Sequence, residues 1–284
     1  FILNGAECEP YLTSDHRLMV EKPQEILTGM KIMMKILGCR KGYIAIEKNK
    51  PDAIEVMQRV LEESRNGYDL IALQVKYPQG AEKQLIKAIT GREVPRGGLP
   101  MDVGCLVQNV GTAKAVYDAL AMNQPLIERV VTVTGRGIKE PKNLLVRLGT
   151  PFANLFEYCG GLTESAGKVI MGGPMMGLAQ YTNQVPVIKG TSGIVVLDKN
   201  ESKIPEPLPC ISCARCVDSC PMKLMPNILG TYVEYNKFDK AKEWGIMDCI
   251  ECGTCSYICP SKRRLVHLIK YGKLQVTRAS KAAA

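Results

Sequence analysis

Apolar and polar residues follow two different patterns along this chain. In the first 125 residues, short apolar runs alternate with longer stretches in which apolar residues recur every three or four positions. The short runs predict strands over Phe1–Leu3, Tyr43–Glu47 and Leu70–Val75. The longer stretches predict helices over Pro23–Leu37, Asp52–Arg65, Ala81–Thr90 and Thr112–Met122. Strands that alternate with helices of this length are typical of an α/β domain with a largely parallel sheet.

From Glu128 the pattern becomes that of short strands. It predicts strands over Arg129–Thr134, Leu144–Arg147 and Lys168–Met171, a short helix over Thr150–Tyr158 and a loop over Gly172–Gly177, which together indicate a small β-grasp unit. Two further strands, Val185–Lys189 and Gly193–Leu197, are expected before a proline-rich segment at 205–209. We therefore expect four parts: an α/β domain (1–126), a β-grasp domain (127–184), strands with a linker (185–204) and a C-terminal domain (205–284).

The composition, with 46% hydrophobic and 23% charged residues, is that of a globular protein and excludes disorder, collagen and coiled coil. The most apolar run, Met30–Leu37, contains Lys31 and Lys35, and no run reaches the ~18 residues that cross a bilayer. The sequence therefore predicts no transmembrane helix. Because the chain opens on strand-like residues, we expect further sequence of the same domain to precede it.

The twelve cysteines fall into two classes. Cys8, Cys39, Cys105 and Cys159 are scattered, and the last three are expected to be core thiols. The other eight form two runs of the same spacing, C-x2-C-x2-C-x3-C-P: Cys210, Cys213, Cys216 and Cys220, then Cys249, Cys252, Cys255 and Cys259. This is the spacing with which two-cluster ferredoxins bind two [4Fe–4S] clusters.

The spacing also predicts which cysteines share a cluster. Two-residue gaps let three thiolates surround one cluster, whereas the fourth cysteine of each run serves the other cluster. One cluster is thus assigned to Cys210, Cys213, Cys216 and Cys259, and the other to Cys249, Cys252, Cys255 and Cys220. Zinc sites usually use two C-x2-C pairs and disulfides need an oxidising compartment, so both alternatives fit less well. Helical patterning over Pro226–Tyr235 and Phe238–Trp244 predicts a helix-rich module.

The formal net charge is +9, and two oxidised clusters, at about −2 each, would bring it nearer to about +5. The excess concentrates after Ser261, where Lys and Arg residues meet no acidic residue in the sequence. This segment could face anionic lipid, an acidic ferredoxin-type partner or only solvent. The chain has no aromatic platform or recognition motif for nucleic acid, so no nucleic-acid partner is expected.

Polar loops follow the predicted strands of the front half at 4–10, 77–82 and 107–112. Amide and carboxylate groups that meet helix N-termini can hold a ribityl chain, a phosphate or a nicotinamide ribose. From spacing alone, ordinary helix capping and turn chemistry is the better explanation of the same residues. The chain lacks the common dinucleotide and P-loop fingerprints, and its only histidines, His16 and His267, are expected to be surface or packing residues.

Five motifs occur in an order that resembles one family. They are Asn4-Gly-Ala-Glu-Cys-Glu-Pro-Tyr with Asp15-His-Arg17, Tyr77-Pro-Gln-Gly-Ala-Glu82, Gln108-Asn-Val-Gly-Thr112, Gly172-Gly-Pro-Met-Met-Gly177, and the doubled cysteine run. Together they resemble the family of C subunits of Rnf electron transport complexes, which is related to the flavin subunit of respiratory complex I. The resemblance covers essentially the whole chain.

The resemblance implies a Rossmann-like domain for non-covalent FMN and NAD(H), a β-grasp domain of the SLBB type, and a dicluster ferredoxin domain. It implies that Asn4 contacts FMN, that Glu7 and Glu9 lie beside the flavin and nicotinamide, and that Gln108, Asn109 and Thr112 hold the ribityl and phosphate side. Gly80 and Glu82 match a Gly-Glu-Glu loop of the relative, with Ala81 replacing one glutamate. The family's glycine-rich loop for flavin and nucleotide would precede residue 1.

The implied function is that of a peripheral subunit on the cytoplasmic side of a membrane-bound ferredoxin:NAD+ oxidoreductase. Hydride would pass between NAD(H) and FMN, and single electrons would pass through the two clusters, while other subunits of this translocase move Na+ or H+. A ferredoxin-type iron–sulfur protein is the expected redox partner. Two alternatives remain open: a cobalamin reductase of the same family, and a flavin-free iron–sulfur relay.

Overall fold

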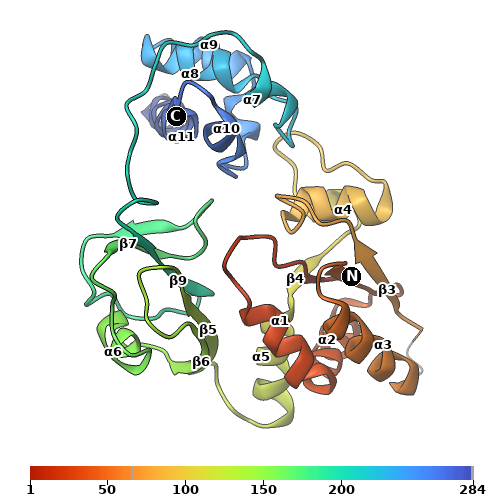
Figure 1. Ribbon diagram of the computed structural model, residues 1–284. Helices are drawn as coiled ribbons and strands as arrows, with labels where there is room; N and C mark the ends of the chain where they lie inside the picture. The colour runs from red at the N-terminus through yellow and green to blue at the C-terminus, as the bar shows by residue number, and fades with distance from the viewer. Residues whose placement is uncertain (65–66, 283–284) are drawn as a thin grey trace. The chain divides into compact units, whose positions relative to one another are not determined.

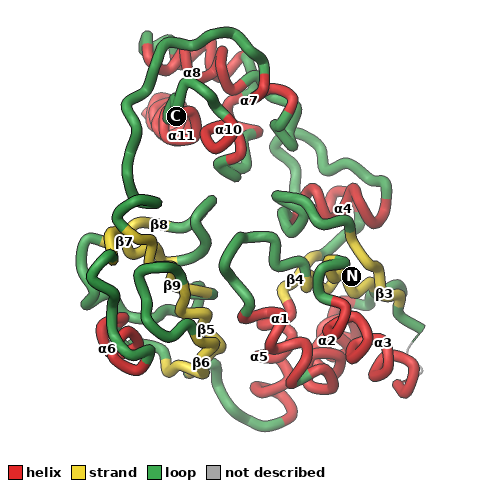
Figure 2. Tube along the Cα trace, in the orientation of Figure 1, coloured by secondary structure: helices red, strands yellow, loops and turns green. Residues whose placement is uncertain are grey.

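The computed structural model describes residues 1–64 and 67–282, so the end of the helix predicted to reach Arg65 lies outside the described residues. The chain forms two compact units, which we call unit 1 (Phe1–Ser202) and unit 2 (Lys203–Ala284). Figures 1 and 2 show that unit 1 contains helices and strands and that unit 2 is built from helices and loops. No helix in the described ranges is both long and apolar enough to cross a membrane.

The α/β part of unit 1 contains a parallel sheet in the order β3-β2-β1-β4. Its strands are β1 (Ile2–Gly5), β2 (Tyr43–Glu47), β3 (Asp69–Leu73) and β4 (Val107–Asn109). The chain adds β2 and β3 on one side of β1 and then returns to place β4 on the other side. The position between β1 and β4 is therefore a topological switch point, where open α/β sheets bind ligands at the carboxyl ends of their strands.

Helices cover both faces of this sheet (Figure 1). They are α1 (Ser14–Glu21), α2 (Pro23–Leu37), α3 (Pro51–Ser64), α4 (Glu82–Thr90), the 3-10 helix η1 (Pro100–Val103) and α5 (Val110–Ala121). The side chains of Leu3, Ile44 and Ile46 pack with α1, α2, α3 and α5. The alternate residues Ile2 and Ala45 pack with α4. This alternation follows from the two-residue period of a strand, and it explains why β1 and β2 carry buried apolar residues on both faces.

The β part of unit 1 is a five-stranded sheet in the order β6-β5-β9-β7-β8, with helix α6 (Phe152–Tyr158) against it. The strands are β5 (Glu128–Thr134), β6 (Lys142–Arg147), β7 (Ala166–Met171), β8 (Leu178–Gln180) and β9 (Gly193–Asp198). β9 lies in the segment 185–204, expected to be strands and linker, yet it pairs with β5 and β7. Residues 193–198 are thus the middle of this sheet.

Unit 2 follows the proline-rich segment and consists of helices, as the patterning predicts. Its elements are α7 (Arg215–Asp218), α8 (Pro226–Glu234), α9 (Phe238–Glu243), the 3-10 helix η2 (Ile246–Asp248), α10 (Thr254–Ile258) and α11 (Leu265–Ala282). Leu229 and Val233 of α8 pack with Ile269 and Val276 of α11. The shared apolar face of these two helices forms the core that supports the cysteine loops.

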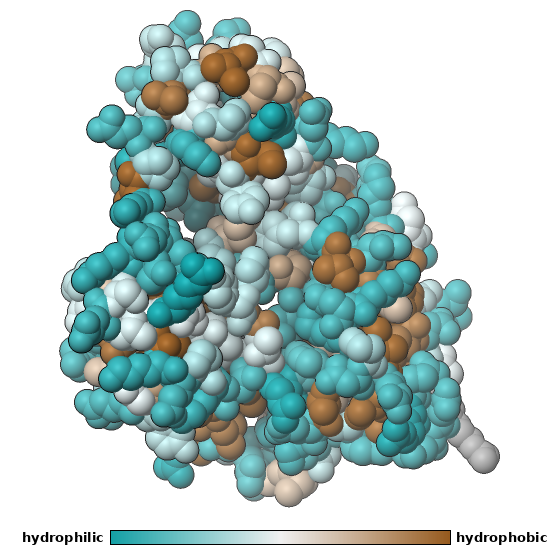
Figure 3. Space-filling model, in the orientation of Figure 1, coloured by the Kyte–Doolittle hydropathy of each residue, from teal (hydrophilic) through white to brown (hydrophobic). Residues whose placement is uncertain are grey.

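Two expectations about local structure are wrong. The segment Val185–Lys189 is not a strand, because only Pro186 makes a bridge, to Pro151. Residues 14–21, for which the patterning predicts neither a helix nor a strand, form α1. The remaining predicted elements are present with boundaries shifted by up to two residues. On the face drawn in Figure 3, hydrophobic side chains form separate small patches among hydrophilic ones, as on an ordinary globular surface.

Candidate functional site

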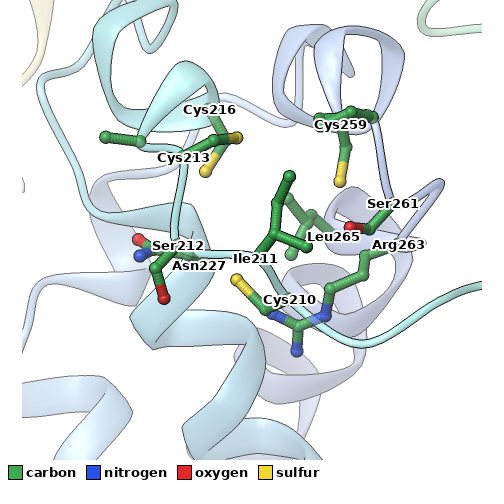
Figure 4. Close-up of a pocket in the computed structure, with 12 residues that line it drawn as sticks. Cys210, Ile211, Ser212, Cys213, Cys216, Asn227, Cys259, Ser261, Arg263 and Leu265 are labelled. Atoms are coloured by element: carbon green, nitrogen blue, oxygen red, sulfur yellow. The ribbon is translucent and has the colours of Figure 1, made fainter.

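The eight clustered cysteines of unit 2 separate into two cavities. The first is lined by Cys210, Cys213, Cys216 and Cys259, and it encloses an empty space of about 340 Å³ that is partly open to solvent. Figure 4 shows the sulfur atoms of these cysteines directed toward a common space. Three come from the first cysteine run and the fourth from the end of the second run.

The second cavity has the complementary set of cysteines. Cys220, Cys249, Cys252 and Cys255 line an empty space of about 360 Å³ together with apolar residues that include Leu224 and Ile269. The backbone N–H of Leu224 lies 3.4 Å from Cys220 Sγ, and that of Glu251 lies 3.3 Å from Cys249 Sγ. N–H groups directed at sulfur are the kind of donor that stabilises a negatively charged iron–sulfur cluster.

The backbone geometry repeats between the two cysteine runs. Two residues after the first cysteine of each run, Ser212 and Glu251 have φ of 55° and 59°. Two residues further, Ala214 has φ 57° and Gly253 has φ 81°. Left-handed residues are unfavourable for most side chains, so their repetition at matched positions indicates that the loop shape is required to direct three sulfur atoms to one point.

The chemistry of this donor set fits iron–sulfur clusters. All twelve cysteines are free thiols, so none of the eight is paired in a disulfide. In the described part of the chain, no three His, Cys, Asp or Glu side chains are arranged to hold a single metal ion. Burial raises the pKa of Cys255 to about 12, so iron must displace a proton to bind this thiol.

Basic residues lie close to both cavities. Arg263 lines the first cavity and forms an ion pair with Glu234 at 2.5 Å. Near the second cavity, Lys273 Nζ donates to the backbone oxygen of Cys249 at 2.9 Å and to Glu251 at 2.6 Å. The basic segment after Ser261 is therefore not a uniform solvated face, because part of its charge is paired within unit 2.

In unit 1, Asn4 connects two of the predicted site loops. Its side-chain Nδ2 donates to the backbone oxygen of Gly80 at 3.0 Å, and its Oδ1 accepts from the N–H of Ala6 at 3.0 Å. The Gly80 N–H in turn donates to Cys8 Sγ at 3.3 Å. A Cβ on Gly80 would lie 2.5 Å from the oxygen of Ala6, so only glycine permits this close approach. These contacts hold the loop after β3 against the end of β1.

The two predicted carboxylates after β1 are also held by the protein. Glu7 accepts hydrogen bonds from the N–H groups of Asp15 and His16 at the start of α1, at 3.0 and 3.2 Å. Glu9 accepts from the N–H groups of Met175 and Met176, at 3.1 and 2.9 Å. Burial raises the pKa of Glu9 despite these bonds. Both side chains therefore organise loops around the carboxyl end of β1.

Asn109 occupies the other side of the switch point. Its Oδ1 accepts from the N–H of Gly111 at 2.7 Å and so caps α5, while its Nδ2 donates to Asp15 at 2.7 Å. The sequence indicates Asp15 only as part of a motif, without a role. Burial, and then the negative charge of Glu7, raise the pKa of Asp15 to about 7. Asp15 and Asn109 line a large cleft beside α1, α5, β5 and β6, with an empty space of about 1570 Å³ that includes open solvent.

The remaining predicted residues lie at the carboxyl ends of strands or at helix starts. Thr112 is exposed in the first turn of α5 and lines the same cleft. Glu82 is exposed in the first turn of α4, and Gln108 is half-buried in β4. Sequence reasoning missed the buried pair Lys50–Glu47, at 3.1 Å, whose Lys50 Nζ also reaches the oxygen of Glu7. The pair lies at the end of β2 and in the turn before α3, where helical spacing rules do not apply, so the sequence pattern carries no signal for it.

The α5 N-terminus at the switch point, with its N–H groups, fits the phosphate of a nucleotide-type cofactor. Family models match each part of the chain. Residues 1–118 match the Nuo51 FMN-binding domain, residues 130–179 the SLBB domain and residues 209–263 the 4Fe-4S dicluster domain. The predicted architecture is thereby confirmed, as are FMN and [4Fe–4S] clusters as the cofactor classes.

Curated relatives match over nearly the whole chain. It is 48% identical over 274 residues to the C subunit of the proton-translocating ferredoxin:NAD(+) oxidoreductase complex of Clostridium ljungdahlii, covering 96% of this chain and 60% of that protein. It is 49% identical over 276 residues to the C subunit of the Na(+)-translocating ferredoxin:NAD(+) oxidoreductase complex of Acetobacterium woodii, covering 97% and 62% respectively. The chain thus spans less than two thirds of the length of these relatives.

Solved structures share the fold at low identity. An NAD+-reducing [NiFe]-hydrogenase in the air-oxidized state has a chain that aligns with a TM-score of 0.62 and 20% identity, covering 84% of this chain and 47% of that chain. The H2-reduced state aligns with a TM-score of 0.64 and 15% identity, covering 94% and 55%. At this identity the likeness concerns the fold alone.

Proposed function

The chain belongs to the family of C subunits of ion-translocating oxidoreductase complexes, and from this premise we propose that it transfers electrons between NAD(H) and a one-electron iron–sulfur partner. The observation that carries the proposal is the presence, in one chain, of two four-cysteine cavities and a parallel sheet matching an FMN-binding domain. FMN, when bound, supplies the conversion between two-electron and one-electron transfer.

Unit 2 holds the two [4Fe–4S] clusters in this proposal. Cys210, Cys213, Cys216 and Cys259 ligate one, and Cys249, Cys252, Cys255 and Cys220 ligate the other. The crossed arrangement of cysteines around the cavities supports this assignment. Because each cluster takes one cysteine from the other run, the two loops must be held together, which α8 and α11 do through their shared core.

Unit 1 provides the FMN and NAD(H) site at the carboxyl ends of β1 and β4. The N-terminus of α5, with Gln108, Asn109 and Thr112, binds the ribityl and phosphate side. Asn4, through its bonds to Gly80 and Ala6, orients the loops around the flavin ring, with Glu7, Glu9 and Glu82 on the nicotinamide side. No side chain has to act as a general base, because hydride transfer needs no proton removal by the protein.

The same premise gives the cellular setting. We place the chain as a peripheral subunit at the cytoplasmic side of the membrane, in a complex whose other subunits carry out Na+ or H+ transport and exchange electrons with a ferredoxin-type protein. The relatives named as members of such complexes support this setting. The domain boundaries at 126, 184 and 204 belong to the proposal, except that β9 is counted with the five-stranded sheet of the preceding domain.

Two other functions use the same parts. A cobalamin reductase would pass electrons from the clusters to a cobalamin, and a flavin-free relay would use the clusters alone. The names of the curated relatives favour the first proposal over both.

An anaerobic titration tests the proposal. The protein is loaded with iron, sulfide and FMN, desalted, and then mixed with NADH while the flavin and cluster absorbance is followed. We expect retained FMN, bleaching in both bands and rapid NADH oxidation with a dye acceptor. Clusters that form but stay oxidised, with no FMN retained, would establish the relay instead.

A matched pair of variants tests the site itself. Glu82→Gln removes a carboxylate proposed to lie on the nicotinamide side, and Glu62→Gln removes an exposed carboxylate on α3. We expect Glu82→Gln to lower NADH oxidation about tenfold or more at unchanged iron and FMN content, and Glu62→Gln to have no effect. Equal rates in both variants would remove Glu82 from the proposed site.

A further inference from the structure

Arg263 is a buried charge in the wall of the first cysteine cavity. Arg263 is only 6% exposed, and its guanidinium lies in the cavity wall with the four cysteines (Figure 4). The position follows from the chain path: Arg263 lies four residues after Cys259, and the N–H of Leu208 donates to the oxygen of Ser261 at 2.8 Å, which holds this turn against the segment that leads into Cys210.

One half of this guanidinium is paired and the other half is not. Nη2 donates to Glu234 at 2.5 Å, whereas Nη1 is buried without any hydrogen-bond partner among the residues the structure describes. Leaving a charged N–H donor buried and unsatisfied is strongly unfavourable, so such a group calls for an acceptor that the protein atoms do not provide. The cavity beside it is where a cluster would present sulfur atoms.

The wall of the second cavity is different in character. Its lining residues other than the cysteines are uncharged, among them Met222, Leu224, Thr254 and Ile269. Lys273 approaches that cavity only through the backbone oxygen of Cys249, and its charge is balanced by Glu251 at 2.6 Å. Solvent access differs as well, because the first cavity has two exposed cysteines, Cys210 and Cys213, whereas every cysteine of the second is buried or half-buried.

We propose that Arg263 donates a hydrogen bond from Nη1 to a sulfur atom of the first cluster and thereby sets the reduction potential of this cluster above that of the second. The inference rests on the ligand assignment of the proposed function. On reduction one electron enters the cluster, no bond forms or breaks, and Arg263 keeps its proton, since guanidinium does not titrate in proteins. Hydrogen bonds to sulfur, nearby positive charge and solvent exposure all favour the reduced, more negative form.

A direct consequence concerns where electrons accumulate. A first electron entering unit 2 would occupy the cluster of Cys210, Cys213, Cys216 and Cys259, and the second cluster would be reduced only at lower potential. Arg263 is a positioning residue in this account, because it acts on the cluster's energy and is not a ligand.

The test is a redox titration of the cluster-loaded protein followed by electron paramagnetic resonance, comparing Arg263→Gln with Arg264→Gln. The two variants remove the same charge at adjacent positions, but Arg264 is exposed. We expect Arg263→Gln to shift the redox equilibrium of one cluster about tenfold toward the oxidised form, which is about 59 mV for one electron, and Arg264→Gln to shift it far less. The same comparison is repeated in a Cys220→Ser background, which removes a ligand of the second cluster. A paramagnetic signal that persists there belongs to the first cluster.

Glu234→Gln provides a test of opposite sign. This change removes the carboxylate that balances the charge of Arg263. The side chain of Glu234 is 42% exposed, so folding should be preserved. The uncompensated guanidinium should then move the first cluster's equilibrium toward the reduced form. This variant decides the matter if Arg263→Gln fails to take up iron.

The outcomes separate the inference from the proposed function. A wild-type protein that binds no clusters would refute the ligand assignment. Clusters that form normally, with equal midpoints in wild type, Arg263→Gln and Glu234→Gln, would overturn only the role of Arg263. Equal shifts in Arg263→Gln and Arg264→Gln would likewise overturn it, because they would show a general surface-charge effect.

Discussion

The two units treat their proposed site residues differently. In unit 2 the cysteines face cavities, and Arg263 Nη1 has no protein partner within the described ranges. In unit 1, Asn4 and Glu9 are bound to backbone groups of neighbouring loops, and Glu7 is bound to N–H groups at the start of α1. The site of unit 1 is thus organised by the protein's own hydrogen bonds, whereas the site of unit 2 is completed only by the metal that its cysteines would bind.

The difference indicates two ways of coupling a cofactor to folding. Metal ligands must be deprotonated and brought together, so binding free energy becomes folding free energy. A loop that is already held by hydrogen bonds gains little structure when its ligand binds. The entropic cost of binding is therefore small, which favours ligand affinity. We therefore expect cofactor removal to affect the stability of unit 2 much more than that of unit 1.

The largest effect is expected from pairs of cysteine replacements. In the crossed arrangement Cys210 and Cys259 serve one cluster, so the double variant Cys210→Ser, Cys259→Ser should retain about half of the ~8 iron atoms that two clusters contain. The double variant Cys210→Ser, Cys220→Ser should lose both clusters. Iron and sulfide analysis of the purified proteins measures this directly. The reverse result would mean that each run binds its own cluster.

Removal of iron should unfold part of unit 2 and leave unit 1 intact. Without clusters, the loops at 210–220 and 249–259 lose their common ligand, and we expect amide exchange there to accelerate by orders of magnitude. Strands β1, β2 and β5 serve as the internal control, since their exchange should not change. Equal acceleration in both units would contradict the proposed difference.

In unit 1 the close approach of Gly80 to Ala6 predicts a backbone clash in Gly80→Ala. The new Cβ would lie 2.5 Å from a backbone oxygen that cannot turn away, and we expect a loss of roughly 2–3 kcal/mol in unfolding free energy with weaker FMN binding. Gly190→Ala is the matched control, because a Cβ there meets nothing within 4 Å. Urea unfolding and FMN titration provide the two measurements; similar values for both variants would show that the loop can relax.

The smallest effect is the pH dependence that Asp15 introduces. Its pKa is raised to about 7 in the folded chain, from an ordinary value of 3.8. Between these values the folded chain holds a proton that the unfolded chain has released, so stability falls as pH rises through this window. The wild-type chain should therefore lose unfolding free energy between pH 5 and pH 8. After a discount for solvent screening, Asp15→Asn should avoid about 1–2 kcal/mol of this loss.

This prediction has its own control in the same unit. The introduced asparagine would keep an amide oxygen to accept from Nδ2 of Asn109, so the helix start should be preserved. Asp69→Asn changes an exposed aspartate in β3 and should leave the pH profile unchanged. Urea midpoints at pH 5 and pH 8 decide the question, and parallel profiles for wild type and Asp15→Asn would count against a proton on Asp15.

The sequence predicts unit 2 well for a physical reason. Cluster ligation requires four sulfur atoms at short and regular intervals, so the spacing of Cys210 to Cys220 and Cys249 to Cys259 determines most of the geometry.

In unit 1, the helix Pro23–Leu37 and the strand Tyr43–Glu47 are also predictable. The helix buries one apolar face between a starting proline and a closing glycine, and the strand is apolar and buried over nearly its whole length.

Interactions between distant segments could not be predicted in this way. The start of α1 depends on Glu7, seven residues or more from the groups it binds, and the sequence around 14–21 has little apolar character. Val185–Lys189 has strand-like residues, but no neighbouring strand pairs with it beyond Pro186 in the described part of the chain. Arg263 is one of several basic residues in sequence, and only the turn after Cys259 distinguishes it by burial.

The position of β9 in its sheet has a mechanical consequence. The segment that leads to unit 2 follows directly after a strand that is hydrogen-bonded along both edges, parallel to β5 and antiparallel to β7. Tension transmitted through this segment would first load the β7 ladder, which extends to Asp198, and would reach the β5 ladder only at Val195. The tether between the two units is thus anchored in an interior strand of the sheet and not in an edge strand.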